Sequence, residues 1–336
     1  MKKLLIVLLA LTVLGVFAFA QDAEKATVTL TGKVETGMQF LLKDKTVAMH
    51  DDDSGTPGRV DLDVKATLGD FELGYYLRDD DISGASGTHG ITVPNYWVGY
   101  SFLDKMVTLR AGNTDASTTK TVNKGWGNGI DSKNGVQLIA APVAGLQIGG
   151  AWGYLSDTQI DYANKSNAAV GFTYAITDIG ALCANYESVD KLFTAGFNYT
   201  GMPNLTAQLE MYYIANSDIQ EMEFFQNVAY AMGALKPMLA VYEGKTKDAA
   251  FSFKINPEVD YTVSPVILIG VSGNYTSDKD AYAFKDITTD KAYNFSPFVQ
   301  FNFNALASCL KIWYDSGDLN NSGAGQKLEI NFRSFF

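Results

Sequence analysis

The chain has 336 residues and a formal net charge of −11, which argues against nucleic acid or an anionic membrane surface as its partner. Beyond the N-terminal leader, no window holds about eighteen consecutive apolar residues, which excludes a helical membrane protein. Aromatic residues make up 12% of the chain, Gly occurs 31 times and the mean hydropathy is close to zero. This composition fits a β-barrel whose apolar outer face and polar inner face cancel in the average.

The first 20 residues have the layout of a secretory signal peptide. Lys2 and Lys3 form a charged region, residues 4–19 form an apolar region, and Ala18-Phe19-Ala20 provides a small-residue cleavage site. We therefore predict a signal peptide at 1–20 and a single-domain barrel at 21–336. Without the two lysines the net charge falls from −11 to −13.

The mature chain consists of amphipathic segments with a period of two. The large apolar residues of 26–40 (Val28, Leu30, Val34, Met38 and Phe40) share one parity, and so do those of 58–68, whereas a helix would space them three and four apart. Gly69-Asp70 then leads into the alternating segment 71–78, which predicts a β-hairpin with a tight turn. Residues 327–336 alternate in the same strict way. These patterns predict strands.

Short and long connections alternate between the predicted strands. Residues 69–70 and 142–145 are typical of the short set, and residues 43–57, 79–90 and 113–134 of the longer, polar set. This is the layout of an outer-membrane barrel, with turns on the periplasmic side and loops outside. We predict an all-β, transmembrane, antiparallel up-and-down β-barrel of about 18 strands. A count of 16 is the alternative, because alternation is weak at 224–242 and the connection 188–191 is short.

In each predicted strand, the side chains on the face opposite the apolar face are polar. We expect this polar face (the inward parity) to line the interior of the barrel. In lipid an open sheet edge would leave unpaired backbone groups, so the sheet must close, and barrels of 16 to 18 strands leave an aqueous channel. A soluble sandwich would make this parity its wet face. Aromatic residues near strand ends on the apolar parity, such as Tyr100 and Trp152, favour the barrel because they match interfacial girdles. The predicted lumen-lining residues are Asp61, Asp63, Lys65, Glu72, Glu187 and Glu210, with Arg59, Arg78 and Arg110 near the outer ends of strands two, three and five.

Two segments carry a resemblance to known families. Residues 327–336 resemble the terminal strand that the barrel-assembly machinery recognises in bacterial outer-membrane proteins, which implies that Phe336 is an assembly signal. Residues 106–112, followed by Asn113-Thr114-Asp115, resemble the strand before the constriction loop in general porins of Gram-negative bacteria. The N-terminal leader and the general sequence pattern are also similar to those of major surface proteins of spirochaetes.

The porin resemblance implies an outer-membrane channel for passive diffusion of small hydrophilic solutes or ions, and a homotrimer. The acidic charge balance adds a mild preference for cations. The resemblance further implies that the loop 113–134 folds inward and faces the three arginines named above. The family's usual acidic-aromatic-glycine motif is absent, and an exposed glycine-rich surface loop is the alternative. The candidate constriction residues on this loop are Asp115, Lys120, Lys124, Trp126 and Asp131.

Two other classes of function stay open. A structural surface protein or adhesin would use a barrel with a filled lumen to display its loops. An outer-membrane hydrolase would need His50 or His89 beside a carboxylate, and Asp51–Asp53 and Asp79–Asp81 lie near them in the sequence. Cys183 and Cys309 form no zinc or redox motif. We expect no cofactor, no metal, no catalytic residue and no nucleic-acid partner.

Overall fold

A computed structural model gives the fold. It describes residues 26–49, 58–79, 91–114, 130, 135–154, 166–189, 191–215, 221–245, 247, 250–277, 293–303, 308–319 and 325–336. The predicted signal peptide, His50 and His89 lie outside these residues. The described residues contain no helix long and apolar enough to cross a membrane.

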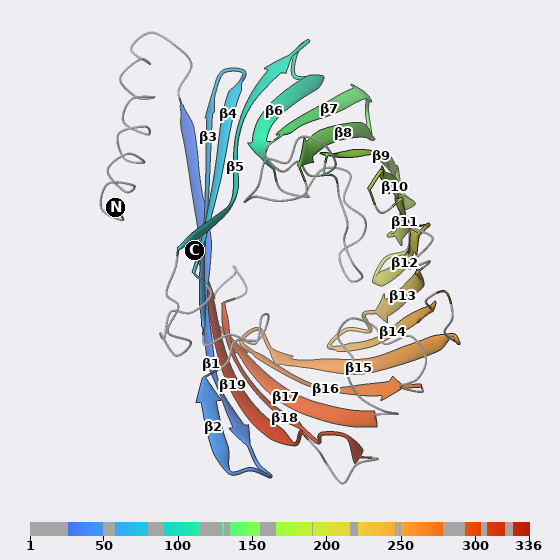
Figure 1. Ribbon diagram of the computed structural model, residues 1–336. Helices are drawn as coiled ribbons and strands as arrows, with labels where there is room; N and C mark the ends of the chain where they lie inside the picture. The colour runs from blue at the N-terminus through green and yellow to red at the C-terminus, as the bar shows by residue number, and fades with distance from the viewer. Residues whose placement is uncertain are drawn as a thin grey trace.

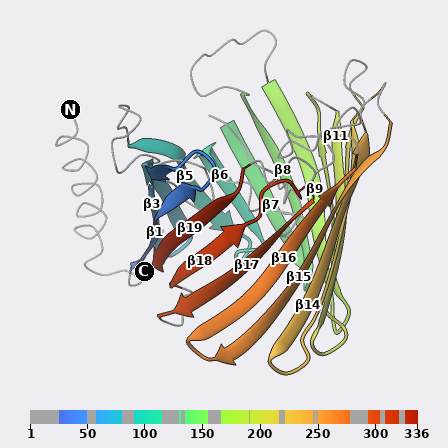
Figure 2. The same ribbon diagram turned by 90° about the horizontal axis from the view of Figure 1, so that it is seen from below.

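The described strands form one antiparallel sheet that closes on itself (Figures 1 and 2). Closure comes from the pairing of the first strand with the last, in a register that sets Glu35 opposite Arg333. The strands are β1 (Thr27–Leu41), β2 (Thr46–Met49), β3 (Arg59–Leu68), β4 (Phe71–Asp79), β5 (Thr92–Phe102), β6 (Val107–Asn113), β7 (Gly135–Val143), β8 (Leu146–Tyr154), β9 (Ser166–Ile176), β10 (Gly180–Glu187), β11 (Leu192–Tyr199), β12 (Leu205–Ile214), β13 (Met222–Tyr230), β14 (Leu235–Lys245), β15 (Ser252–Ser264), β16 (Ile267–Thr276), β17 (Tyr293–Asn302), β18 (Cys309–Asp315) and β19 (Lys327–Phe335).

The 19 labelled strands form an 18-stranded wall. The reason is that β2 and β3 both pair with β1 on the same side, each with a different part of it. Residues 38–41 of β1 pair with β2, and residues 27–35 of β1 pair with β3, on the same side of β1. The prediction of an 18-stranded antiparallel barrel is therefore confirmed. The prediction that residues 43–57 are entirely loop is wrong, since Thr46–Met49 continues the hairpin that β1 begins.

The predicted alternation of connections is also confirmed. Connections at the end of the barrel that holds the Gly69-Asp70 turn are two to six residues long, and those at the other end range from four to 21 residues. Thr27 of β1 pairs with Thr67 of β3, and the backbone of Phe336 exchanges hydrogen bonds with Gly32 at 2.9 and 3.1 Å. The start of the first strand and the end of the last strand therefore lie at the end of the barrel that holds the short turns.

The two faces of the wall have an inside-out distribution of polarity. Large apolar side chains on the outer parity are exposed, for example Leu30 (55%), Val98 (53%) and Trp152 (47%). Carboxylate side chains on the inner parity are buried instead, including Glu35 (1%) and Glu329 (0%). A soluble protein would expose such groups to water and bury the apolar ones, so this wall suits an apolar surrounding and a polar interior.

Candidate functional site

The candidate site is the inner wall of the barrel, where charged side chains gather on β19, β1, β3 and β4. Asp61 of β3 is at their centre and is only 5% exposed. Its carboxylate lies 2.8 Å from Nη2 of Arg59, 3.2 Å from Nε of Arg78 and 3.7 Å from Nζ of Lys33. Tyr76 completes the group, because its hydroxyl lies 3.2 Å from Nη2 of Arg59 and 2.9 Å from Nη2 of Arg78.

Glu35 extends this cluster across the junction of β1 and β19. Its carboxylate accepts a hydrogen bond from Nζ of Lys33 at 2.7 Å and forms an ion pair with Arg333. Further along the same junction, Glu329 accepts a hydrogen bond from Gln39 at 2.8 Å and pairs with Lys327. We call the residues Lys33, Glu35, Arg59, Asp61, Arg78 and Arg333 the ionic cluster. Four cations and two carboxylates meet in it.

Arg110 forms a second, separate arrangement on β4, β5 and β6. Its Nε donates to Glu72 at 2.7 Å, and its guanidinium carbon lies 4.2 Å from the centre of the Trp97 ring. Two glycines make room for these side chains. A Cβ on Gly74 would lie 2.3 Å from the Trp97 ring, and one on Gly99 would lie 2.7 Å from the Glu72 side chain. The glycines therefore allow Trp97 and Glu72 to lie flat across the neighbouring strand.

Ile130 is the one described residue between Thr114 and Gly135. Its carbonyl oxygen accepts a hydrogen bond from Nε2 of Gln137 at 2.7 Å, and both residues are at most 1% exposed. Gln137 lies opposite Arg110 in the strand register, so its side chain is on the inner wall. At Ile130 the connection between β6 and β7 thus contacts the lumen side of the wall. Asp115, Lys120, Lys124, Trp126 and Asp131 are outside the described residues.

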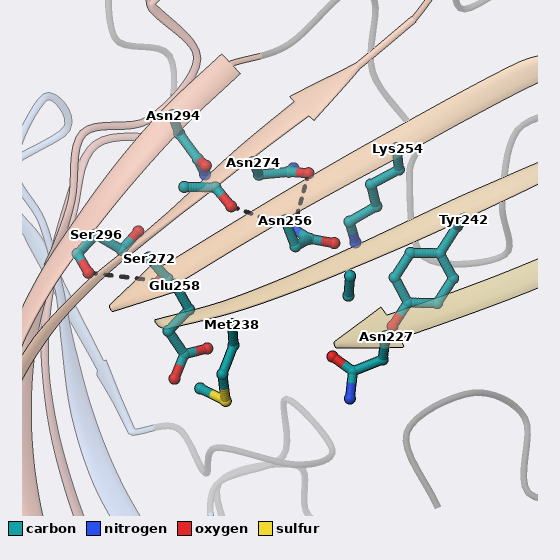
Figure 3. A pocket seen from close by; sticks show the side chains of 12 residues that line it. Asn227, Met238, Tyr242, Lys254, Asn256, Glu258, Ser272, Asn274, Asn294 and Ser296 are labelled. Atoms are coloured by element: carbon teal, nitrogen blue, oxygen red, sulfur yellow. Dashed lines mark hydrogen bonds between the residues drawn. The ribbon is translucent and has the colours of Figure 1, made fainter. Parts of the chain in front are cut away.

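Another part of the inner wall, on β13 to β17, has a different chemistry. A hollow of about 320 Å³ lies against β13 to β17. Figure 3 shows the side chains that line it, most of them neutral and polar. Asn256 of β15 donates to Oδ1 of Asn274 on β16 at 3.1 Å and to the carbonyl of Gly273 at 3.3 Å. On the flanks, Asn227 donates to Gln208 at 3.1 Å and Asn294 donates to Asp315 at 3.2 Å. We call Asn227, Asn256, Ser272, Asn274, Asn294 and Ser296 the amide wall.

The structure places every described residue that the sequence singled out for the lumen on the inner parity. It joins Arg59 and Arg78 through Asp61 and sets Arg110 apart with Glu72. Asp63 and Lys65 pair with each other at 3.3 Å near the short-turn end. Glu187 ends β10, and Glu210 on β12 is 5% exposed. Their roles in permeation stay predictions.

Sequence reasoning missed several of the residues that complete these arrangements. Lys33, Glu35 and Arg333 have the same inward parity as the predicted residues, which is the signal that could have found them. The amide wall was missed because neutral side chains do not stand out among charged ones. Its signal is the recurrence of Asn at inward positions of successive strands, Asn256, Asn274 and Asn294.

Comparison with known proteins shows the fold. The chain is similar to Pseudomonas aeruginosa OprD, with a TM-score of 0.64, 13% identity, and coverage of 94% of this chain and 96% of that one. It is also similar to a BenF-like porin from Pseudomonas fluorescens Pf-5, with a TM-score of 0.60, 11% identity, and coverage of 94% of this chain and 99% of that one. A third similar structure is Pseudomonas aeruginosa OccK2 in complex with glucuronate, with a TM-score of 0.62, 10% identity, and coverage of 94% of this chain and 98% of that one. No protein-family model and no curated protein sequence matches the chain. At 10 to 13% identity these likenesses show the fold, which fits the resemblance to a Gram-negative porin barrel, and none of the three structures is a spirochaete surface protein.

Proposed function

We propose that this chain is an outer-membrane porin, a water-filled channel through which small hydrophilic solutes diffuse passively. The observation that carries the proposal is the closed 18-strand wall with exposed apolar side chains outside and charged, hydrogen-bonded ones inside. A barrel of this strand number is wide enough to leave an aqueous channel rather than a core packed with its own side chains. The similarity in fold to three Pseudomonas porins supports the same function and the outer membrane of a bacterium as its location.

The proposal includes a mild preference for cations. On the inner face of the described strands, acidic and basic side chains nearly balance each other. The excess of negative charge lies in the segments between strands, for example Asp51–Asp53, which precede β3 in the sequence, and Asp80 and Asp81, which follow β4. A negative potential at one mouth of a channel raises the local concentration of cations there. Selectivity is then expected to be weak and to decline with ionic strength.

The ends of the chain and its assembly belong to the same proposal. We infer that residues 1–20 direct export and are removed, and that Phe336 takes part in recognition by the barrel-assembly machinery. The Phe336 ring lies over Gly32, where a Cβ would come within 2.5 Å of it, so the glycine leaves the ring room on the outer face. A homotrimer follows from the porin resemblance. Lipid and the assembly machinery are then the partners of the folded chain.

Two other candidate functions are an adhesin, which would use the barrel to display its loops, and a hydrolase. The adhesin requires a lumen filled by side chains, whereas the described inner wall has a hollow of about 320 Å³ beside the amide wall and another of about 220 Å³ beside Lys311. This observation favours the porin. A hydrolase would depend on His50 or His89, which lie outside the described residues.

Single-channel recording tests the proposal. The purified and refolded protein is inserted into a planar bilayer, and conductance and reversal potential are measured across a salt gradient. Stepwise conductance with a reversal potential slightly toward the cation equilibrium potential is the expected result. A barrel that is folded by circular dichroism and protease resistance but never conducts would overturn the porin and favour the display barrel.

A further inference from the structure

We propose that the amide wall is a subsite for neutral polyhydroxylated solutes, that is, for sugars. This inference rests on the proposed function, because it names the class of solute that the channel favours. It is carried by the hollow on β13 to β17, whose lining combines side-chain amides and hydroxyls with a small apolar surface (Figure 3).

The chemistry of the lining matches a sugar hydroxyl. A side-chain amide offers one acceptor oxygen and two donor hydrogens, and a hydroxyl is both donor and acceptor, so each can satisfy the other. Asn256 uses its Nδ2 for Asn274 Oδ1 and Gly273, and Asn294 uses its Nδ2 for Asp315. Within the part of the chain that the structure describes, this leaves Asn256 Oδ1, Asn294 Oδ1 and Asn274 Nδ2 without a partner. These three asparagines therefore present two carbonyl oxygens and one amide nitrogen to a ligand.

The apolar part of the lining fits the other face of a sugar ring. Met238 and Tyr242 of β14 border the same hollow, and the Tyr242 ring is held against Phe225 at a centroid distance of 4.7 Å. Phe225 is fully buried, so it fixes the position of the tyrosine ring. A pyranose has an apolar C–H face beside its polar rim, and aromatic rings are suited to contact with such a face.

The charges of the hollow argue against an ion as its ligand. Lys254 and Glu258 are the charged residues of its described lining, and their charges cancel. They lie four residues apart on β15, about 13 Å along a strand. Asn256 lies between them on the same face, so the middle of the hollow is neutral.

The size of the hollow is suitable for a small sugar. Its volume of about 320 Å³ is at the lower end of the range of about 300–1,000 Å³ that small-molecule sites occupy. The ionic cluster is built on β19, β1, β3 and β4, so it and the amide wall occupy different parts of the lumen. We infer that neutral sugars contact the amide wall during passage.

Current-noise analysis of single channels tests the inference. The protein in a planar bilayer is titrated with glucose and with maltose, and the sugar-dependent block of the ion current is fitted to a half-saturating concentration. We expect saturable block. In the double variant Asn256→Ala/Asn274→Ala the half-saturating concentration should rise about tenfold, because two neutral hydrogen bonds are lost. The matched control is Asn95→Ala, an inward asparagine on β5, for which no change in sugar block is expected.

Other outcomes distinguish a failure of this inference from a failure of the proposed function. A channel that conducts ions but shows no saturable sugar block, or the same block in the double variant, overturns the sugar subsite and leaves the porin intact. Tighter block by glucuronate than by glucose also overturns it, since the two differ in charge and share the ring. A folded protein without any conductance overturns the proposed function itself.

Discussion

Asp61→Asn is the most informative change in the ionic cluster. The carboxylate is held by three cations within 3.7 Å, so an asparagine keeps the shape of the side chain and removes one negative charge. The cluster then has four cations against the single carboxylate of Glu35. We expect the channel to become more permeable to anions, because the lumen wall at this level gains one net positive charge.

The size of the effect follows from Coulomb's law. A unit charge about 8 Å from a permeating ion in water contributes about 0.5 kcal/mol. A cation loses this amount and an anion gains it, so the cation-to-anion permeability ratio changes by about 1 kcal/mol, or about fivefold. Screening limits the effect, since the Debye length falls from about 30 Å at 0.01 M salt to about 3 Å at 1 M.

The measurement is the reversal potential of Asp61→Asn channels under a salt gradient, at low and at high mean salt. Asp70→Asn is the control, because it removes the same charge from the exposed turn between β3 and β4. The reversal potential of Asp61→Asn should move toward the anion equilibrium potential at about 0.01 M and return to the wild-type value at about 1 M. An unchanged potential at low salt, or an equal shift in Asp70→Asn, would contradict the placement of Asp61 beside the ion path.

Three further changes probe other parts of the barrel. Arg110→Ala removes the partner of Glu72 and should shift the reversal potential toward cations by a similar factor, about fivefold in permeability ratio. Gly74→Ala places a Cβ within 2.3 Å of the Trp97 ring and should lower the free energy of unfolding by about 1–3 kcal/mol, measured by denaturant titration in detergent. Phe336→Ala should reduce the amount of barrel assembled in the outer membrane severalfold, measured by immunoblotting of membrane fractions.

Matched variants give two of these predictions their controls. Gly150→Ala should leave stability unchanged, because the nearest atom to its Cβ would be 3.9 Å away. Phe335→Ala alters the inward-facing neighbour of Phe336 and should assemble normally. A Gly74→Ala protein of wild-type stability would refute the role assigned to the glycine, and equal loss of assembly in both phenylalanine variants would refute a specific role for Phe336. An Arg110→Ala channel with unchanged selectivity would show that Glu72 lies away from the ion path.

The fold could be predicted from the sequence because a period of two has a direct physical meaning. Successive side chains of a strand alternate between faces, so the pattern in residues 26–41 and 327–336 predicted both the strands and the direction of each side chain. The strand β1 was found because its alternation extends over many residues, and β2 was missed because it is short. Four residues, Thr46–Met49, are too few for alternation to stand out from a polar segment.

The arrangement of the site could be predicted only in part. Parity placed Asp61, Arg59 and Arg78 on one face, but their contacts depend on the register between strands. Asp61 faces Arg78 because β3 and β4 pair through a two-residue turn, which a sequence pattern does indicate. Contact between Glu35 and Arg333 depends instead on closure of the whole barrel, which no local pattern encodes.

The position of the ionic cluster at this closure suggests a second role for it. The outer face of β1 and β19 would accept a shift of the register by two residues, since most of the outward positions on both strands are apolar. The inner face would not. The observed register sets Glu35 opposite Arg333 and Gln39 opposite Glu329, whereas a shift by two residues would set Glu35 opposite Asn331 or Phe335. Either alternative would leave a buried carboxylate without its guanidinium partner, which is costly. The same side chains that charge the channel therefore also specify how the first and last strands join.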